Sequence, residues 1–199
     1  MAGNRDKKLV YHLTAIKNLI SIKQNGLLSR RSLRKNRINF KDVADSEILD
    51  GRSQFDLDAM VPFHFIHKSP FDYAVVHANP KTSFALLCVR RTVARAQGWK
   101  IIARHPLSGT ESIEVHEWDD GIDSIDWSQM DRDNRDYDDH ECKMVCMAEA
   151  LSPTNVAFSD ISNIFTASEQ AKDAVLDALG VEHSRLITVN PSMFPRGCK

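Results

Sequence analysis

VPFHFIHKSPFDYAVV, Val61–Val76, is the stretch of this 199-residue chain that says most about its fold. Its first half alternates as a β-strand does, with Val61, Phe63 and Phe65 on one face. Ser69-Pro70 then breaks the run, and a second alternation follows at Phe71, Tyr73 and Val75. The stretch holds three Phe, one Tyr, two His and two Pro, more polar aromatics beside a turn than a plain core strand carries. We therefore expect a strand and a turn that have a functional role in addition to packing in the core.

Length and composition are those of one ordinary soluble domain, residues 1–199, with 42% hydrophobic and 27% charged residues. No apolar run approaches the ~20 residues that span a bilayer. The N-terminus, MAGNRDKKL, lacks the apolar segment of a secretory signal. The cysteines lack the spacing of a disulfide framework; they are Cys88, Cys142, Cys146 and Cys198. We expect a reduced, cytoplasmic protein without a membrane span.

The net charge of −1 conceals an asymmetric distribution of charge. Residues 28–41 contain no acid and six bases, which are Arg30, Arg31, Arg34, Lys35, Arg37 and Lys41. Residues 131–141 contain six acids against two arginines. Two solvated faces that attract each other would account for this pattern. The alternative is that the basic segment binds a polyanion such as nucleic acid.

Strands and helices are expected in an order without a steady βαβ alternation, which favours an α+β fold. Strands are expected at 9–13, 83–89, 99–103, 112–118 and 185–189, with a turn at 106–109. The run SFALLCV at 83–89 is apolar throughout, so it should be buried on both faces. Helices are expected at 14–25, 91–97, 141–147 and 169–179. Thr14 is the expected N-cap of the first, Thr166–Glu169 the capping box of the last, and Gly26 and Gly180 the C-terminal stops.

Several familiar chemistries are absent from the sequence. The eight glycines never form G-x-G, so neither a dinucleotide fingerprint nor a P-loop is present. His140, Glu141, Cys142 and Cys146 match neither a zinc finger nor the deaminase pattern. Two polar residues in apolar settings remain. His12 ends a strand, where a structural role is the commoner one. Glu149 in MVCMAEALSP lies either on an exposed helix face or in a cleft with a task.

Segments spread over most of the chain resemble, in order, the DarT toxins, which are ADP-ribosyltransferases that use NAD+ to modify bases in single-stranded DNA. These segments are YHLTAIKNLISIKQNGLL, VPFHFIHKSPFDY, ARHPLSG, SIDWSQM, MAEALSP and ITVNPSMF. The most specific match is to the family pattern V-P-F-Y-F-x-P-x-S-P-M. MAEALSP resembles Q-A-E-[FA]-L, which carries the catalytic glutamate of the family. The chain departs from the first pattern at His64, His67-Lys68 and Phe71.

The resemblance implies an α+β fold with split antiparallel sheets around an NAD+ cleft, and flanking helices. Val61, Phe63 and Phe65 would build the cleft wall. It implies catalytic roles for Glu149 and Arg52, NAD+-binding roles for His12, Thr14, Asn25 and Arg52, and substrate-binding roles for His105, Arg104, His64, Arg30, Arg31 and Arg34. NAD+ would be a co-substrate, and we expect no metal. Met147 and Leu151 are expected to pack.

The implied reaction breaks the bond between ribose and nicotinamide through an oxocarbenium-like transition state. Glu149 would stabilise the growing positive charge, hydrogen-bond the 2′-hydroxyl or take the proton of the incoming base. His12 would anchor the ribose and adenylate side. Arg52 would contact the pyrophosphate or orient the base.

The implied substrate is single-stranded DNA, modified on thymine, with unstacked bases resting on Phe63, Phe65, Phe71 and Tyr73. The resemblance also implies a monomeric toxin of a toxin–antitoxin or phage-defence system, opposed by a macrodomain-type antitoxin. Other functions stay open: an NAD+-dependent RNA 2′-phosphotransferase, modification of guanine or RNA, and a catalytically dead nucleic-acid-binding module.

Overall fold

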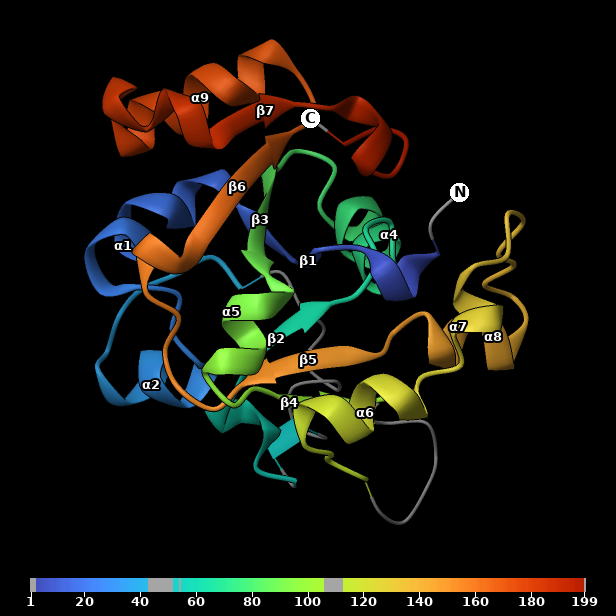
Figure 1. Ribbon diagram of the computed structural model, residues 1–199. Helices are drawn as coiled ribbons and strands as arrows, with labels where there is room; N and C mark the ends of the chain where they lie inside the picture. Colours follow the sequence, from blue (N-terminus) through green and yellow to red (C-terminus); the bar gives the residue numbers. More distant parts are fainter. Residues whose placement is uncertain (1–2, 43–51, 54, 106–112, 199) are drawn as a thin grey trace.

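A computed structural model describes residues 3–42, 52–53, 55–105 and 113–198. A seven-stranded sheet in the order β4-β5-β2-β1-β3-β6-β7 forms its centre (Figure 1). The strands are β1 (Leu9–Ala15), β2 (Val61–His64), β3 (Phe84–Arg90), β4 (Lys100–Ile102), β5 (Glu149–Ser152), β6 (Ile161–Thr166) and β7 (Ile187–Val189). All neighbours are antiparallel except β6 and β7, which are parallel.

The sheet consists of two halves that meet at one residue pair. Strands β4, β5 and β2 form one half, and β1, β3, β6 and β7 form the other. Between β1 and β2 the register contains the single pair Tyr11–His64, whereas β1 and β3 are paired along their whole length. The α+β fold with a split sheet is therefore confirmed.

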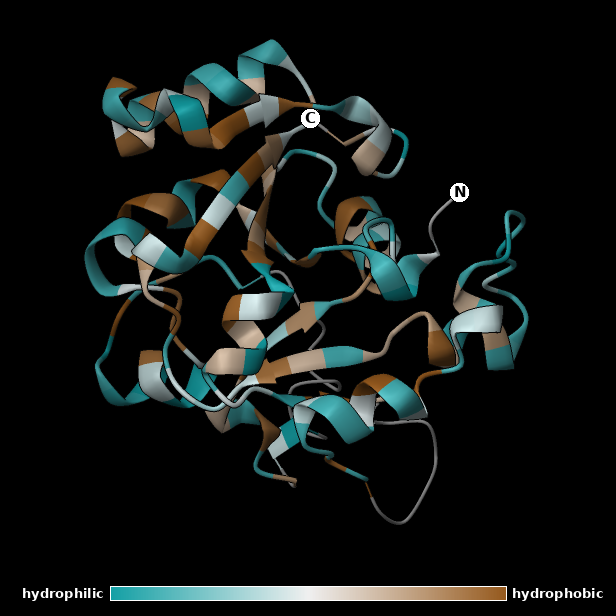
Figure 2. Ribbon diagram, in the orientation of Figure 1, coloured by the Kyte–Doolittle hydropathy of each residue, from teal (hydrophilic) through white to brown (hydrophobic). Residues whose placement is uncertain are grey.

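Helices cover both faces of the sheet, and they are amphipathic where they lie on the surface (Figure 2). They are α1 (Leu19–Asn25), α2 (Arg30–Lys35), α4 (Pro70–Ala78), α5 (Arg91–Ala96), α6 (Trp118–Ser124), α7 (Trp127–Met130), α8 (His140–Val145) and α9 (Glu169–Leu179). No helix in the described residues is long and apolar enough to cross a membrane.

Strand β3 separates two apolar cores, as the run SFALLCV predicts. Ala85, Leu87 and Val89 belong to the larger core, which includes residues of α1 and α9. The alternate residues Phe84, Leu86 and Cys88 belong to a second core with α4 and the chain's C-terminal segment. Because side chains alternate across a strand, an apolar run without polar interruptions is what burial on both faces requires.

The second half of Val61–Val76 is a helix, so the alternation expected there is wrong. Ser69 caps α4, since its Oγ accepts a hydrogen bond from the Asp72 amide at 3.2 Å and Asp72 Oδ2 accepts from the Ser69 amide at 3.0 Å. Pro70 occupies the first helical turn, where its missing N–H costs nothing. This reciprocal capping box outweighs a period-2 pattern of only three residues.

Helix boundaries at two other threonines also differ from expectation. Thr14 is still part of β1, and a 3₁₀ turn (Ile16–Asn18) precedes α1, so Thr14 is no N-cap. Its Oγ1 instead accepts a hydrogen bond from Asn18 Nδ2 at 3.3 Å. Thr166 ends β6, and Ser168 caps α9 through the Ala171 amide at 3.1 Å. Both helices stop at the glycines expected, with φ of 77° at Gly26 and 94° at Gly180.

The remaining strand predictions hold in part. Strands at 83–89, 99–103 and 185–189 correspond to β3, β4 and β7, whereas β5 and β6 were not predicted. In place of a strand at 112–118, His116 makes one isolated bridge to Ile101, and α6 begins at Trp118. The expected turn at 106–109 lies outside the described residues, as does residue 112. The expected helix at 141–147 is α8.

Candidate active site

A cavity opens where β1 and β2 separate beyond the Tyr11–His64 pair. His12, Leu13 and Thr14 of β1 and Val61, Pro62 and His64 of β2 line it. The rest of its wall comes from residues of α1 and the connection to α2, from residues 40–42, and from Arg52, Leu57, Asp58, Met60, Phe71, His105, Met147 and Glu149. It encloses about 1190 Å³ of space, part of it open to solvent.

One glycine fixes the wall between α1 and α2. Gly26 lies in the cavity lining with φ of 77°, and a Cβ built on it would lie 2.6 Å from the carbonyl oxygen of Val156. Leu27 and Val156 exchange backbone hydrogen bonds at 2.8 and 3.0 Å directly beside it. This close approach needs glycine, and it brings Ser29 and Arg30 to the mouth of the cavity.

Arg52 and Glu149 form a buried ion pair in the cavity wall. Arg52 Nη1 donates to both Oε1 and Oε2 of Glu149, each at 2.8 Å. The two side chains are 7% and 6% exposed, so water screens the pair little. Arg52 Nη2 is buried without a partner among the described residues. Glu149 begins a strand, not a helix, which removes the exposed-helix alternative.

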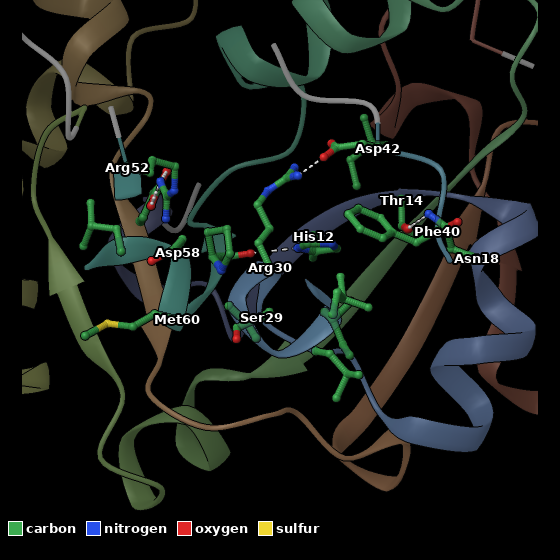
Figure 3. Close-up of a pocket in the computed structure, with 18 of the residues that line it drawn as sticks. His12, Thr14, Asn18, Ser29, Arg30, Phe40, Asp42, Arg52, Asp58 and Met60 are labelled. Atoms are coloured by element: carbon green, nitrogen blue, oxygen red, sulfur yellow. Dashed lines mark hydrogen bonds and ion pairs between the residues drawn. The ribbon is translucent and has the colours of Figure 1, made fainter. Parts of the chain in front are cut away.

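His12 is a neutral hydrogen-bond acceptor in this cavity. Burial lowers its pKa to about 4, a shift that outweighs the hydrogen bond with Pro62. A carbonyl can only accept, so Nδ1 of neutral His12 donates to the Pro62 oxygen at 2.8 Å. The other ring nitrogen, Nε2, then carries a lone pair. Figure 3 shows this hydrogen bond as the dashed line that starts at His12.

Two further histidines lie near Glu149. His64 is paired with Glu149 across β2 and β5, and its ring contacts Phe71 at a centroid distance of 5.5 Å. His64 Nδ1 is buried without a partner in the described part of the chain. Burial lowers the pKa of His105, an effect that the Glu149 charge opposes. The amide of His105 donates to the Met144 oxygen at 2.9 Å.

The opposite wall is formed by the segment after α2. Arg30 reaches toward Asp42, with which it forms an ion pair (Figure 3). Its guanidinium also lies 5.8 Å from the ring centroid of Phe40. Asn18 fixes this segment, since its Oδ1 accepts from the Lys41 amide at 2.8 Å and its Nδ2 donates to the Lys41 oxygen at 3.1 Å.

The structure brings seven of the eleven predicted site residues to the cavity and leaves four outside it. Those in the lining are Glu149, Arg52, His12, Thr14, His105, His64 and Arg30. Asn25 is exposed at the end of α1 and donates to the Ser21 oxygen at 3.1 Å. Arg104 pairs with Glu141 on the surface at 2.7 Å. Arg31 and Arg34 lie on α2, outside the lining.

Residues 28–41 contain no acid, but in the fold aspartates from later parts of the chain pair with two arginines of this basic segment. Arg31 pairs with Asp56 and Asp58, each at 2.6 Å, and Arg30 pairs with Asp42. Arg34 and Arg37 are exposed and form no ion pair with any residue that the structure describes. No ion pair within the described ranges joins the basic segment to residues 131–141.

Two expectations about the aromatic residues are wrong. Phe63 and Phe65 are fully buried in the larger core, against Trp99 and Trp127 respectively, and neither lines the cavity. They therefore support the cleft from behind and cannot stack on bases. The opposite face of β2 supplies His64 to the cavity, together with Phe71 from α4.

Several lining residues were not predicted, notably Asn18, Phe40, Asp42, Asp58 and Met147, the last having been assigned to packing. No pattern marks Phe40 or Asp42, because their position depends on the hydrogen bonds of Asn18. The S-P-x-D sequence at residues 69–72 could have placed Phe71, because this capping-box pattern predicts a helix that begins at Pro70. No group of three or more His, Cys, Asp or Glu side chains in the described ranges is placed to hold a metal ion.

Comparison with known proteins gives a family and a fold. A family model described as "ssDNA thymidine ADP-ribosyltransferase, DarT" matches residues 11–195. No curated protein matches the chain significantly. Among solved structures, Thermosipho africanus DarTG in complex with ADP-ribose is 23% identical and superposes with a TM-score of 0.78 over 94% of this chain. The chain spans about half of that protein, 51%.

Thermus sp. 2.9 DarT is similar over nearly its whole length. Its structure in complex with ADP-ribosylated ssDNA is 18% identical, with a TM-score of 0.77 over 94% of this chain and 96% of its own. Its complex with NAD+ is 17% identical, with a TM-score of 0.74 over 96% and 98%. At such identities the superpositions establish the fold, and the match over residues 11–195 establishes the family. The chain therefore belongs to the DarT family of ssDNA thymidine ADP-ribosyltransferases.

Proposed function

We propose that this protein transfers ADP-ribose from NAD+ to thymine in single-stranded DNA, with Glu149 and Arg52 as catalytic residues. The observation that carries the proposal is the buried Arg52–Glu149 pair in the wall of the cavity between β1 and β2. Burying two charges is expensive and gives little net stability. A pair kept in a cavity wall is therefore better explained by chemistry than by folding.

Glu149 stabilises the positive charge that develops on the ribose as nicotinamide leaves. A fixed carboxylate in a water-poor site acts more strongly than one in water, and it needs no reorganisation during the reaction. Arg52 holds this carboxylate by contacting both of its oxygens. Its Nη2, which has no partner among the residues that the structure describes, can donate to an acceptor on NAD+ or on the target base.

His12 and Thr14 bind the ribose side of NAD+. Neutral His12 offers Nε2 as an acceptor for a sugar hydroxyl, since Nδ1 is occupied by Pro62. Thr14 lies at the end of β1 in the same lining, with Asn18 bonded to its hydroxyl. The low pKa of His12, about 4, keeps it neutral at physiological pH and avoids repulsion from Arg30.

The DNA contacts His64 and His105 on one wall of the cavity and helix α2 on the opposite wall. His64 and His105 line the cavity near Glu149. Of the four aromatic residues that were predicted to stack on bases, Phe71 is the one that lines the cavity. Arg30, Arg31 and Arg34 on α2 supply positive charge for phosphates, two of them already balanced by aspartates.

The test is incubation with labelled NAD+ and matched single-stranded, duplex and RNA oligonucleotides, followed by mass spectrometry of the nucleosides. Label on thymine in single strands is expected. ADP-ribose on guanine or RNA would keep the enzyme class and change the target. Transfer of a 2′-phosphate would make the protein a phosphotransferase, and binding without NAD+ consumption would make it an inactive binding module.

Glu149→Gln keeps the shape of the side chain and removes its charge. We expect transfer to fall by at least roughly 10²–10³, the usual cost of losing one fixed electrostatic stabiliser. NAD+ affinity should change little, because the carboxylate acts mainly in the transition state. Glu141→Gln, at an exposed glutamate outside the cavity, is the matched control. Single-turnover rates and NAD+ titrations of both variants decide; near wild-type rates in Glu149→Gln would remove it from catalysis.

The cellular role that we propose is that of a monomeric, single-domain, cytoplasmic toxin opposed by a macrodomain-type antitoxin. The similarity to Thermosipho DarTG, a chain about twice as long as the matched region, supports the pairing with an antitoxin. Expression in a bacterial host should arrest growth, and a co-expressed macrodomain protein that removes ADP-ribose from DNA should restore it. Growth arrest by the Glu149→Gln variant would refute a toxicity that depends on transfer.

A further inference from the structure

Thymine must lose a proton when it becomes a nucleophile. In thymidine N1 carries the deoxyribose, so N3 is the ring nitrogen that still bears hydrogen. When N3 bonds to the ribose carbon, the ribose–nicotinamide bond breaks and its electron pair neutralises the nicotinamide ring. The leaving group therefore takes no proton, and a base in the cavity must accept the one from N3.

Glu149 is poorly placed for that second task. Both of its oxygens accept from Arg52 Nη1 at 2.8 Å, and its charge is needed opposite the ribose. His12 is committed through Nδ1 to the Pro62 oxygen, on the β1 side of the cavity. A base for the target should lie beside Glu149 and be free of other hydrogen bonds.

His64 meets both conditions. It is directly opposite Glu149 in the β2–β5 register, and such opposite residues point to the same face with Cβ atoms about 4.5–5.5 Å apart. Its side chain lines the cavity although the residue is only 7% exposed. Within the described ranges neither ring nitrogen has a hydrogen-bond partner, and Nδ1 is buried in that state.

The surroundings of His64 suit a base that gains positive charge. The charged and titratable groups that face it are Glu149 from β5, Arg52, His12 from β1, His105 after β4 and Asp72 from α4. Burial raises the pKa of Asp72, and a positively charged His64 opposes that rise, so the two groups lie within electrostatic reach. Phe71, the neighbour of Asp72 on α4, contacts the His64 ring and offers a flat surface for the target.

We propose that His64 is the catalytic base for the target: its neutral imidazole accepts the N3 proton of thymine as N3 bonds to the ribose carbon. The inference rests on the proposed function and adds to it a separate residue for proton removal. Glu149 then serves the ribose and His64 serves the base. The two side chains lie directly opposite each other on β5 and β2. The carboxylate faces the positive charge that develops on the ribose, and the imidazole takes the proton that thymine loses.

The decisive experiment varies the acidity of N3. His64→Gln should lower the single-turnover rate on a thymine oligonucleotide by roughly 10²–10⁴, the usual contribution of a general base, with NAD+ affinity unchanged. Replacing the thymine by 5-bromouracil, whose N3 proton is more acidic, should accelerate His64→Gln much more than the wild type. Phe71→Leu is the matched control, which changes the wall beside His64 without removing a base. It should lower the rate but keep the wild-type ratio between the two oligonucleotides.

A wild-type rate in His64→Gln, or an oligonucleotide ratio equal to that of the wild type, would overturn the inference. A second measurement needs no substitution at His64. His105→Asn should keep the wild-type ratio between the thymine and 5-bromouracil oligonucleotides. A much larger acceleration by 5-bromouracil in His105→Asn than in the wild type would transfer the role to His105. A wild type that labels no DNA would refute the proposed function itself, whereas normal labelling with these outcomes refutes only the role of His64.

Discussion

At the scale of single residues, Arg52 and Glu149 depend on each other. Glu149 is buried in β5, where an unpaired carboxylate would be protonated or would destabilise the fold. Arg52 lies in a segment far away in sequence and reaches it through Nη1 alone. The fork of the guanidinium thus leaves Nη2 for another acceptor. The pair thus presents the Glu149 carboxylate to the ribose and Arg52 Nη2 to an acceptor on NAD+ or on the target base.

Substitutions at Arg52 can separate these two tasks. Arg52→Lys keeps a positive charge for Glu149 but lacks the second amino group of the fork. We expect it to lose more than tenfold in kcat/KM while its unfolding free energy changes by about 1 kcal/mol or less. Arg52→Met leaves a buried carboxylate unpaired, and we expect a loss of roughly 3–5 kcal/mol. Urea denaturation and transfer rates of both variants test this; equal stability losses would show that Nη1 does not act through its charge.

At the scale of elements, the connection from β2 to α4 shows how a local signal shapes the site. The capping box of Ser69 and Asp72 starts α4 at Pro70, a short turn after the four-residue strand β2 ends at His64. His64 ends the strand and Phe71 lies in the first turn of the helix, so that their rings meet at the cavity. One stretch of sequence therefore supplies two side chains of the wall from two different elements.

Helix α2 divides its positive charges between structure and solvent. Ser29 caps it by accepting from the Ser32 amide at 3.2 Å. Arg30 and Arg31 are bound by aspartates from later segments and thereby fix α2 against the cavity. Arg34 is exposed on α2, and Arg37 is exposed directly after it. These two are the better candidates for contacts to phosphates.

Salt dependence tests this division. Each phosphate contact adds about 0.7 to the log–log salt slope for a single strand, so Arg34→Ala with Arg37→Ala should reduce the slope by about 1.4. Affinity for NAD+ should stay the same. Arg90→Ala with Arg185→Ala removes the same charge from exposed positions outside the cavity lining and serves as control. DNA-binding titrations over a range of salt concentrations decide; equal slopes in both double variants would place the DNA elsewhere.

At the scale of the whole molecule, the cavity exists because the two half-sheets separate. The two half-sheets are joined at the residue pair Tyr11–His64. Hydrogen bonds of Arg91 strengthen this junction. Arg91 donates to the carbonyl oxygens of Leu9 at 3.1 Å and Phe65 at 3.3 Å, one beside each half. The strands are thus held together at one end and diverge at the other, where NAD+ would enter between them.

The global stability should depend on pH through histidines that stay neutral in the fold. Burial lowers the pKa of His12 and of His67 to about 4, and it also lowers that of His105. In the unfolded chain these groups take a proton near pH 6.5, so the unfolded state binds more protons and stability falls as pH falls from about 6.5 toward 4.

We expect each of the two strongly shifted histidines to contribute up to about 2 kcal/mol to the loss between pH 7 and pH 5. His67→Gln should remove its share, because glutamine takes no proton in this range. His77→Gln, at an exposed histidine, is the control and should leave the pH dependence unchanged. Urea denaturation at several pH values gives the comparison. An identical decline in His67→Gln and the wild type would contradict the neutral state of the half-buried His67.

The sequence alone determined the elements whose signals are local. The apolar run at 83–89 specified a strand buried on both faces, and glycines 26 and 180 specified where two helices end. Family motifs in the sequence also pointed to His12 and Glu149, and both residues line the cavity. Local signals failed where two of them competed, as at Ser69, whose capping box overrode a short alternation.

Only the tertiary structure decided which charges are available and which faces line the cavity. Asp42, Asp56 and Asp58 neutralise Arg30 and Arg31 although no acid lies within residues 28–41. Phe63 and His64 are neighbours in sequence, yet one lies in the core and the other in the cavity. A strand's alternation gives two faces but does not say which one the core covers, because that depends on strands and helices distant in the chain.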